Sequence, residues 1–135
     1  MDDEIRDHCA LPLPIPILFI NGTEDQAFPW DGSTRDGRRR LSVKETLAAW
    51  RALDGCSDAS TVDTLPDLHD DGTRVWEETW SDCAGAAALM FFGVEGGGHT
   101  WPSGPGPFPP GRTTQEICSK EILDFLGRHH FAGGR

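Results

Sequence analysis

The sequence predicts an α/β domain in which helices flank a mostly parallel sheet. Two short and nearly continuous apolar runs, at 17–20 and 86–94, have the composition of strands buried on both faces. Capping boxes at Ser42 and Thr113 each introduce a segment with helical apolar spacing. The chain has 135 residues, of which 37% are hydrophobic, and this is enough for one domain with a modest core.

The first predicted strand, 17–20, follows a proline-rich segment and ends at Asn21-Gly22, a turn signal. A helix should then begin at the capping box Ser42-x-x-Glu45 and end at Gly55, and it should pack on the sheet. Its apolar face is formed by Val43, Leu47 and Trp50.

The segment 57–72 is polar and rich in aspartate, so we expect a surface loop, with His69 solvated. Residues 74–80 alternate between large and charged side chains, which is typical of a half-exposed strand, whereas 86–94 suits a central one. Together the two strands are expected to form a hairpin around Cys83.

The last predicted helix begins at Thr113-x-x-Glu116 and ends near Leu126, with Gly127 as its stop. Its inward side chains are Cys118, Ile122 and Phe125. Residues 1–11 are then a lead-in and 127–135 a frayed tail, so the chain is a single domain.

A net charge of −10 disfavours nucleic acid or an anionic membrane as a partner, and the basic run 37–40 is interpreted as a solvated loop. No stretch has the roughly 18 consecutive apolar residues of a membrane helix, and the acidic start lacks the features of a secretory signal. The cysteines and histidines lack metal-ligand spacing, so neither a metal nor a cofactor is expected.

Four cysteines favour disulfides instead. Cys56 ends a predicted helix and Cys83 opens a predicted strand, which makes them plausible partners. For Cys118, a buried free thiol and a bridge to Cys9 both remain open. Bridges would indicate a secreted parent protein whose signal lies upstream of this sequence.

The candidate catalytic residues lie in two motifs, each of which follows one of the two apolar strands. The segment 17–25 ends in Asn-Gly-Thr-Glu-Asp, and the segment 96–102 reads Gly-Gly-Gly-His-Thr-Trp-Pro. In that chain order, Asp25 and His99 suit the acid and the base of a hydrolytic triad. A lone aspartate in such a turn is more often a turn former, and Glu24 is the alternative acid. It is the joint pattern that favours catalysis.

No nucleophile accompanies this pair. None of the seven serines lies in a G-x-S-x-G elbow, which should precede the acid in the chain. The nearest approach to an elbow surrounds Cys83, but it follows the acid, and a disulfide role is the better interpretation of that cysteine.

The segments 21–32, 41–46, 54–56 and 96–102 resemble the polyhydroxybutyrate depolymerase and feruloyl esterase-like family of α/β-hydrolases. The resemblance extends over 12–126, and it implies the C-terminal half of an α/β-hydrolase, with the half that carries the nucleophile absent.

Two catalytic positions are implied by this resemblance: Asp25 matches the family's acid and His99 its histidine. Relatives usually have histidine where Asn21 stands, so a contact that lines the site should differ. The family also tends to have cysteine at Cys56 and Cys83, which supports their pairing.

The sequence therefore leads to two hypotheses. In the first, the chain is a fragment of a secreted serine esterase that acts on short or hydroxy-acyl esters, polyesters or feruloylated sugars, and Trp101 and Pro102 contact the substrate. Its partner would be the missing N-terminal half. In the second, it is a non-catalytic remnant that at most binds or pairs with another chain.

Overall fold

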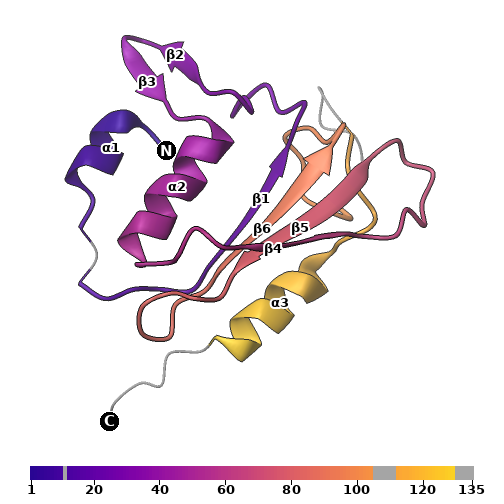
Figure 1. Cartoon of the computed structure of the whole chain (residues 1–135). Coiled ribbons are helices and arrows are strands. Elements are labelled where there is room, and N and C mark those ends of the chain that lie inside the picture. The colour runs from indigo at the N-terminus through magenta and orange to yellow at the C-terminus, as the bar shows by residue number, and fades with distance from the viewer. Residues whose placement is uncertain (11, 105–111, 130–135) are drawn as a thin grey trace.

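The computed structural model describes residues 1–10, 12–104 and 112–129 (Figure 1). A four-stranded sheet lies at its centre, and a separate two-stranded hairpin lies near the start of the long helix α2. Along the chain the elements are α1 (Asp3–His8), β1 (Ile17–Gly22), β2 (Ser33–Arg35), β3 (Arg38–Arg40), α2 (Val43–Leu53), β4 (Thr61–Thr64), β5 (Arg74–Trp80), β6 (Leu89–Glu95) and α3 (Ser119–Arg128). None of the described helices is both long enough and apolar enough to span a bilayer.

The central sheet is mixed, with the strand order β1-β6-β5-β4. Strand β1 runs parallel to β6, whereas β5 is antiparallel to both β6 and β4. The prediction of a mostly parallel sheet, as in the C-terminal half of an α/β-hydrolase, is therefore wrong. The described sheet is mostly antiparallel, and few helices accompany it.

The error has a physical cause in the apolar run that forms β6. Such a run reports burial on both faces of a strand, and it carries no information about the direction of the neighbouring strands. Every residue of β6 from Leu89 to Val94 is buried. Its two neighbours nevertheless run in opposite directions relative to it.

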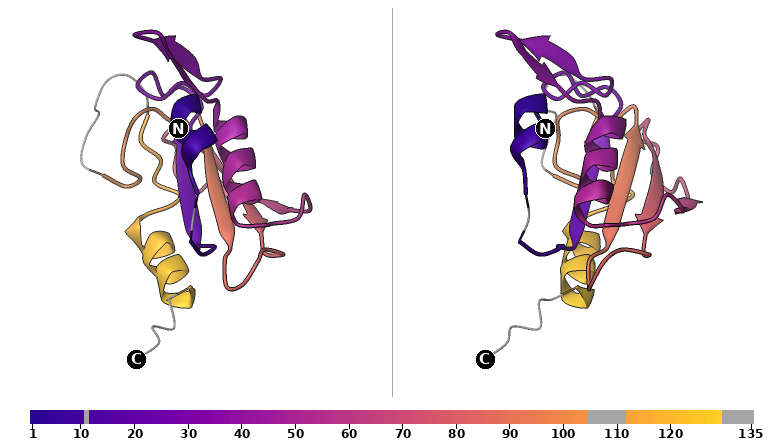
Figure 2. Two further views of the ribbon diagram at one scale, coloured as in Figure 1. Left: turned by 90° about the vertical axis from the view of Figure 1, so that its left-hand side faces the viewer. Right: turned by 60° about the vertical axis from the view of Figure 1, so that its left-hand side comes forward.

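Alternate residues of β6 build two separate cores. Figure 2 shows α2 and α3 on opposite faces of the sheet. On the α3 side the buried cluster includes Met90, Phe92, Val94, Ile117 and Phe125. On the α2 side it includes Val43, Leu47, Trp80, Leu89 and Phe91. The period of two along the strand thus places one helix on each face.

Helix α2 begins and ends where the sequence predicts. The side chain of Ser42 accepts the Glu45 N–H at 3.1 Å, and the Glu45 carboxylate accepts the Ser42 N–H at 2.9 Å, which completes the capping box. After the helix, Gly55 adopts a φ of +61°, the left-handed conformation that commonly stops a helix.

Helix α3 begins later than predicted, because the expected cap at Thr113 does not form. The Cys118 thiol accepts the Lys120 N–H, and Glu121 closes the box. Glu116 instead accepts the N–H groups of Leu68 and His69 at 2.8 and 2.7 Å, so its carboxylate holds the segment before β5. The helix reaches Arg128, and residues 130–135 of the expected tail lie outside the described residues.

Four elements were not predicted from the sequence. Strand β4 lies in the segment interpreted as a loop, and its four residues are all exposed. Strands β2 and β3 form a hairpin around Asp36-Gly37, whose φ angles of +54° and +76° are those of a tight primed turn. The basic run 37–40 is therefore largely a strand. Helix α1 was also not predicted.

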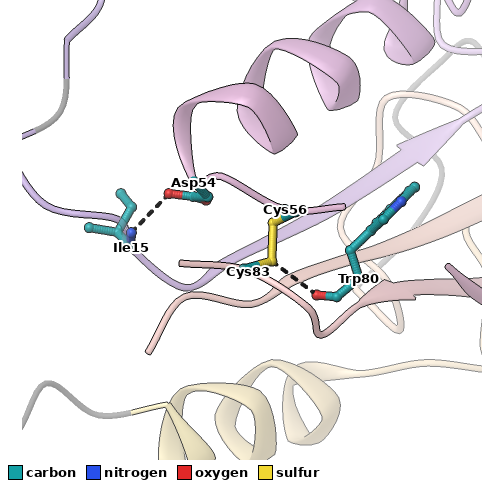
Figure 3. The surroundings of a disulfide bond; sticks show 5 residues. All are labelled: Ile15, Asp54, Cys56, Trp80 and Cys83. Atoms are coloured by element: carbon teal, nitrogen blue, oxygen red, sulfur yellow. Dashed lines mark hydrogen bonds between the residues drawn. A yellow bond between two sulfur atoms is a disulfide. The ribbon is translucent and has the colours of Figure 1, made fainter. Parts of the chain in front are cut away.

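The disulfide between Cys56 and Cys83 is present as expected, and it joins the end of α2 to the turn between β5 and β6 (Figure 3). Beside it, the fully buried carboxyl of Asp54 accepts the Ile15 N–H at 2.9 Å. Its second oxygen has no partner among the described residues, and burial raises the pKa of Asp54. Cys9 and Cys118 are free thiols, so the alternative bridge between them is not formed.

Candidate active site

The parallel pair β1 and β6 brings the two sequence motifs to one edge of the sheet. Gly22 is paired with Val94, so both strands end at the same level. The Thr23 N–H donates to the Val94 carbonyl at 2.9 Å, and the Glu24 N–H donates to the Gly97 carbonyl at 2.8 Å. The acidic turn and the histidine turn are thus joined through their backbones.

Glycine is needed where these two turns touch. A Cβ atom on Gly22 would lie 2.1 Å from the carbonyl oxygen of Gly97, so any other residue would force the backbone to move. Gly96 has a φ of +73°, a conformation that favours glycine. Close approach of the two backbones thus accounts for Gly22, and a left-handed backbone conformation accounts for Gly96.

Asp25 lies directly after this junction and is 7% exposed. Its Oδ1 accepts the N–H groups of Ala27 and Phe28, both at 2.8 Å. Its Oδ2 lies 2.9 Å from Nδ1 of His99. Three donors therefore fix the carboxylate, and one of them is the imidazole.

The side chain of His99 is 58% exposed, although its Nδ1 meets a buried partner. Because an ionised carboxylate only accepts hydrogen bonds, Nδ1 is the protonated nitrogen of the neutral ring. Nε2 is then the basic nitrogen. Within the described residues it makes no hydrogen bond, and His99 lines a hollow of about 150 Å³.

Two residues that the sequence analysis did not single out support this pair. The Phe28 ring lies 5.5 Å from the His99 ring, and the Arg40 guanidinium lies 5.2 Å from the centre of the same phenyl ring. Nη1 of Arg40 also donates to the Ala27 carbonyl at 2.9 Å. The Asp36-Gly37 turn signal, which delivers β3, could have drawn attention to Arg40.

The other candidate residues occupy different places. Glu24, the alternative acid, is exposed, and the structure gives it no contact with His99. Asn21 and Pro102 line the hollow beside His99. Trp101 is exposed and does not line that hollow. Its indole N–H donates to the Ser119 hydroxyl at 3.3 Å.

No nucleophile reaches His99 in the described chain. Neither a serine hydroxyl nor a thiol hydrogen-bonds to its ring in the residues that the structure describes. The same residues contain no group of three or more histidine, cysteine or carboxylate side chains suited to a metal ion. The arrangement can take up and return a proton, and it needs a nucleophile from elsewhere.

The chain is similar to a protein described as "Putative esterase NocK" from Nocardia uniformis subsp. tsuyamanensis, with 30% identity over 128 residues. The alignment covers 84% of this chain but only 37% of that protein, so the chain spans little more than a third of its relative's length. The similarity supports a relationship to esterases in general, and it does not distinguish depolymerases from feruloyl esterases. No protein-family profile and no solved structure matches the chain.

Proposed function

We propose that Asp25 and His99 are the acid and the base of a Ser-His-Asp triad in a carboxylic-ester hydrolase of the polyhydroxybutyrate depolymerase or feruloyl esterase type. The observation that carries the proposal is the 2.9 Å contact between Asp25 Oδ2 and His99 Nδ1, with the carboxylate buried and the ring exposed. The similarity to an esterase supports it independently.

In this reaction Nε2 of His99 takes the proton of a serine hydroxyl as the oxygen attacks the ester carbonyl. The buried Asp25 carboxylate stabilises the imidazolium that forms, and it keeps the ring in one orientation. The imidazolium then protonates the departing alkoxide. In the second half of the cycle, His99 activates water in the same way, and the acyl group is released as an acid.

The serine and the donors that stabilise the oxyanion would come from a segment that this chain does not contain. The relative extends well beyond the aligned region, which leaves room for such a segment. The disulfide is compatible with an extracellular protein, and we propose that the parent enzyme is secreted.

Trp101 and Pro102 remain our candidates for contact with the substrate. Pro102 lines the hollow next to His99, and 59% of the Trp101 surface is exposed. A proline beside the base, and an exposed aromatic ring two residues after it in the chain, suit the apolar part of an acyl or aryl group.

The test is hydrolysis of p-nitrophenyl butyrate by the protein extended through its upstream reading frame. We expect turnover that falls by about 10⁶-fold in His99→Ala, the scale on which loss of the triad histidine acts in a serine hydrolase. His8→Ala, which changes an exposed histidine in α1, is the matched control and should retain activity.

Two results would contradict the proposal. Turnover by the extended protein that does not depend on His99 would remove the base from the mechanism. An extended reading frame without an elbow serine and without turnover would favour the non-catalytic remnant. The 135-residue chain alone should show no activity, and turnover by it would place a nucleophile within these residues.

A further inference from the structure

A second hollow lies beside the candidate active site, between β1, the end of β3 and the first turn of α2. Its volume is about 120 Å³. The wall is mostly apolar, with Phe19, Phe28 and Leu41 among its members, and its polar residues are Asn21, Arg40 and Thr46. Among the described residues of this wall, Arg40 carries the only ionisable side chain.

Arg40 has hydrogen-bonding capacity to spare. A guanidinium has five N–H donors in a fixed fork, and one of them is used by the Ala27 carbonyl. Arg40 also forms an ion pair with Asp2, but at 4.0 Å between Nε and Oδ1 this contact is too long for a hydrogen bond. The side chain is 30% exposed, and it forms part of the wall of the hollow.

The two hollows are neighbours that share part of their walls. Asn21 and Phe28 line both this second hollow, which we call the Arg40 hollow, and the hollow at His99. The centre of the Phe28 ring lies 5.5 Å from the centre of the His99 ring and 5.2 Å from Cζ of Arg40. A ligand that occupied both hollows would have one end at His99 and the other at Arg40.

We propose that the Arg40 hollow binds the carboxylate end of the substrate, so that the preferred esters have an acyl chain ending in a free carboxylate. The guanidinium fork matches a carboxylate in geometry and charge, and the apolar wall suits the methylene chain. A cation in this position is a local feature, because the chain as a whole has a net charge of −10. This inference deepens the proposed function and rests on it.

The experiment compares monoethyl glutarate, an anion, with diethyl glutarate, its neutral counterpart, by titration of the ¹⁵N-labelled 135-residue chain in two-dimensional NMR spectra. We expect saturable shifts at the amides of Phe28 and Leu41, with the anion bound about tenfold more tightly than the diester. Added salt should reduce this preference.

Variants distinguish two roles of Arg40: binding of the anion, and support of the turn at Ala27 through its hydrogen bond to that carbonyl. Arg40→Gln keeps a donor for the Ala27 carbonyl but removes the charge, and it should abolish the preference for the anion. Arg39→Gln is the matched control: Arg39 pairs with Glu45, and neighbouring strand residues point to opposite faces, so the preference should remain. Asp2→Asn removes the competing carboxylate of this ion pair and should strengthen binding of the anion.

Equal affinities of the wild-type chain for the two glutarates would overturn the inference, and this comparison does not depend on how any variant folds. A preference that survives in folded Arg40→Gln would also overturn it, because Arg40 would then serve only to support the turn. Binding requires no serine, so the two proposals fail separately. An extended protein that binds the anion without hydrolysing esters refutes the esterase, whereas hydrolysis of p-nitrophenyl butyrate without a carboxylate preference refutes only the Arg40 site.

Discussion

Gly22 and Gly97 meet backbone to backbone at the edge of the sheet, so that a Cβ atom on Gly22 would lie 2.1 Å from the Gly97 carbonyl oxygen. That carbonyl also accepts the Glu24 N–H at 2.8 Å. Together with the hydrogen bond from the Thr23 N–H to the Val94 carbonyl, this contact holds the acidic turn against the histidine turn and so brings Asp25 next to His99.

We predict that Gly22→Ala destabilises the protein by about 1–3 kcal/mol, because the new methyl group must displace backbone rather than a side chain. Urea denaturation measures the loss. In NMR spectra, the resonance of the His99 Nδ1 proton should weaken or move as the two turns separate. Gly127→Ala is the control: its Cβ would meet nothing within 4 Å, and alanine favours the helix, so stability should rise by about 0.5–1 kcal/mol.

Asp25 and His99 should contribute unequally to stability. Asp25→Ala leaves the N–H groups of Ala27 and Phe28 without their acceptor, and we expect a loss of about 1–3 kcal/mol in the free energy of unfolding. His99→Ala removes only one of the three donors to Asp25, and from an exposed ring, so it should cost less, about 0.5–1.5 kcal/mol. Equal losses in the two variants would show that Asp25 serves only to hold the histidine.

The disulfide should account for a large part of the stability. Cys56 and Cys83 are 27 residues apart, and the chain-entropy model for a loop of that length predicts a loss of about 3–4 kcal/mol for Cys56→Ala/Cys83→Ala. Urea denaturation of the variant and the wild type measures it. Thiol titration of the unfolded chain provides a check, since only Cys9 and Cys118 should react before reduction.

Asp54 should make the protein more stable, relative to Asp54→Asn, as the pH falls. Burial raises the pKa of Asp54 in the folded state, although the N–H of Ile15 lowers it in part. The folded chain therefore holds this proton more tightly than the unfolded chain does. The resulting stabilisation is complete below the unfolded pKa of about 3.9, and it is lost as the pH rises through the folded value.

The measurement for Asp54 is the difference in unfolding free energy between the wild type and Asp54→Asn at several pH values from about 3.5 to 7. The comparison with Asp54→Asn is needed because carboxylates with a lowered pKa make the protein less stable as the pH falls, which would mask the effect of Asp54 in the wild type alone. One of them is Glu45, whose pKa is lowered to about 2 by its hydrogen bonds with Arg39 and Ser42. A difference that does not change with pH would refute the role of Asp54.

Local signals in the sequence were sufficient for the elements that position the site. The capping box at Ser42, the strand at 17–20 and the hairpin around Cys83 each depend on neighbouring residues, and each was confirmed. The expected burial of the first strand on both faces was wrong, because β1 lies at the edge of the sheet and is only half-buried. The pairing of Asp25 with His99 was expected from their places after two strands, and the structure does place them in contact. Their catalytic roles stay a prediction.

Features that depend on distant residues were not predictable in this way. The direction of each strand is set by its connections and not by its composition, which is why the parallel sheet was wrong. The Thr113 box failed because the carboxylate of Glu116 is engaged by the backbone of Leu68 and His69, nearly fifty residues earlier. The exposed strand β4 has no buried face, so it left no apolar pattern.

The parallel ladder between β1 and β6 also has a practical consequence. It holds Asp25 and His99 together with contacts that come entirely from the described residues. If the parent protein is a serine hydrolase, a cut just before β1 would divide it into one piece with the nucleophile and another in which the acid and the base are already paired. Neither piece would turn over substrate alone, so their reassembly could be followed as a gain of signal in a split-enzyme reporter.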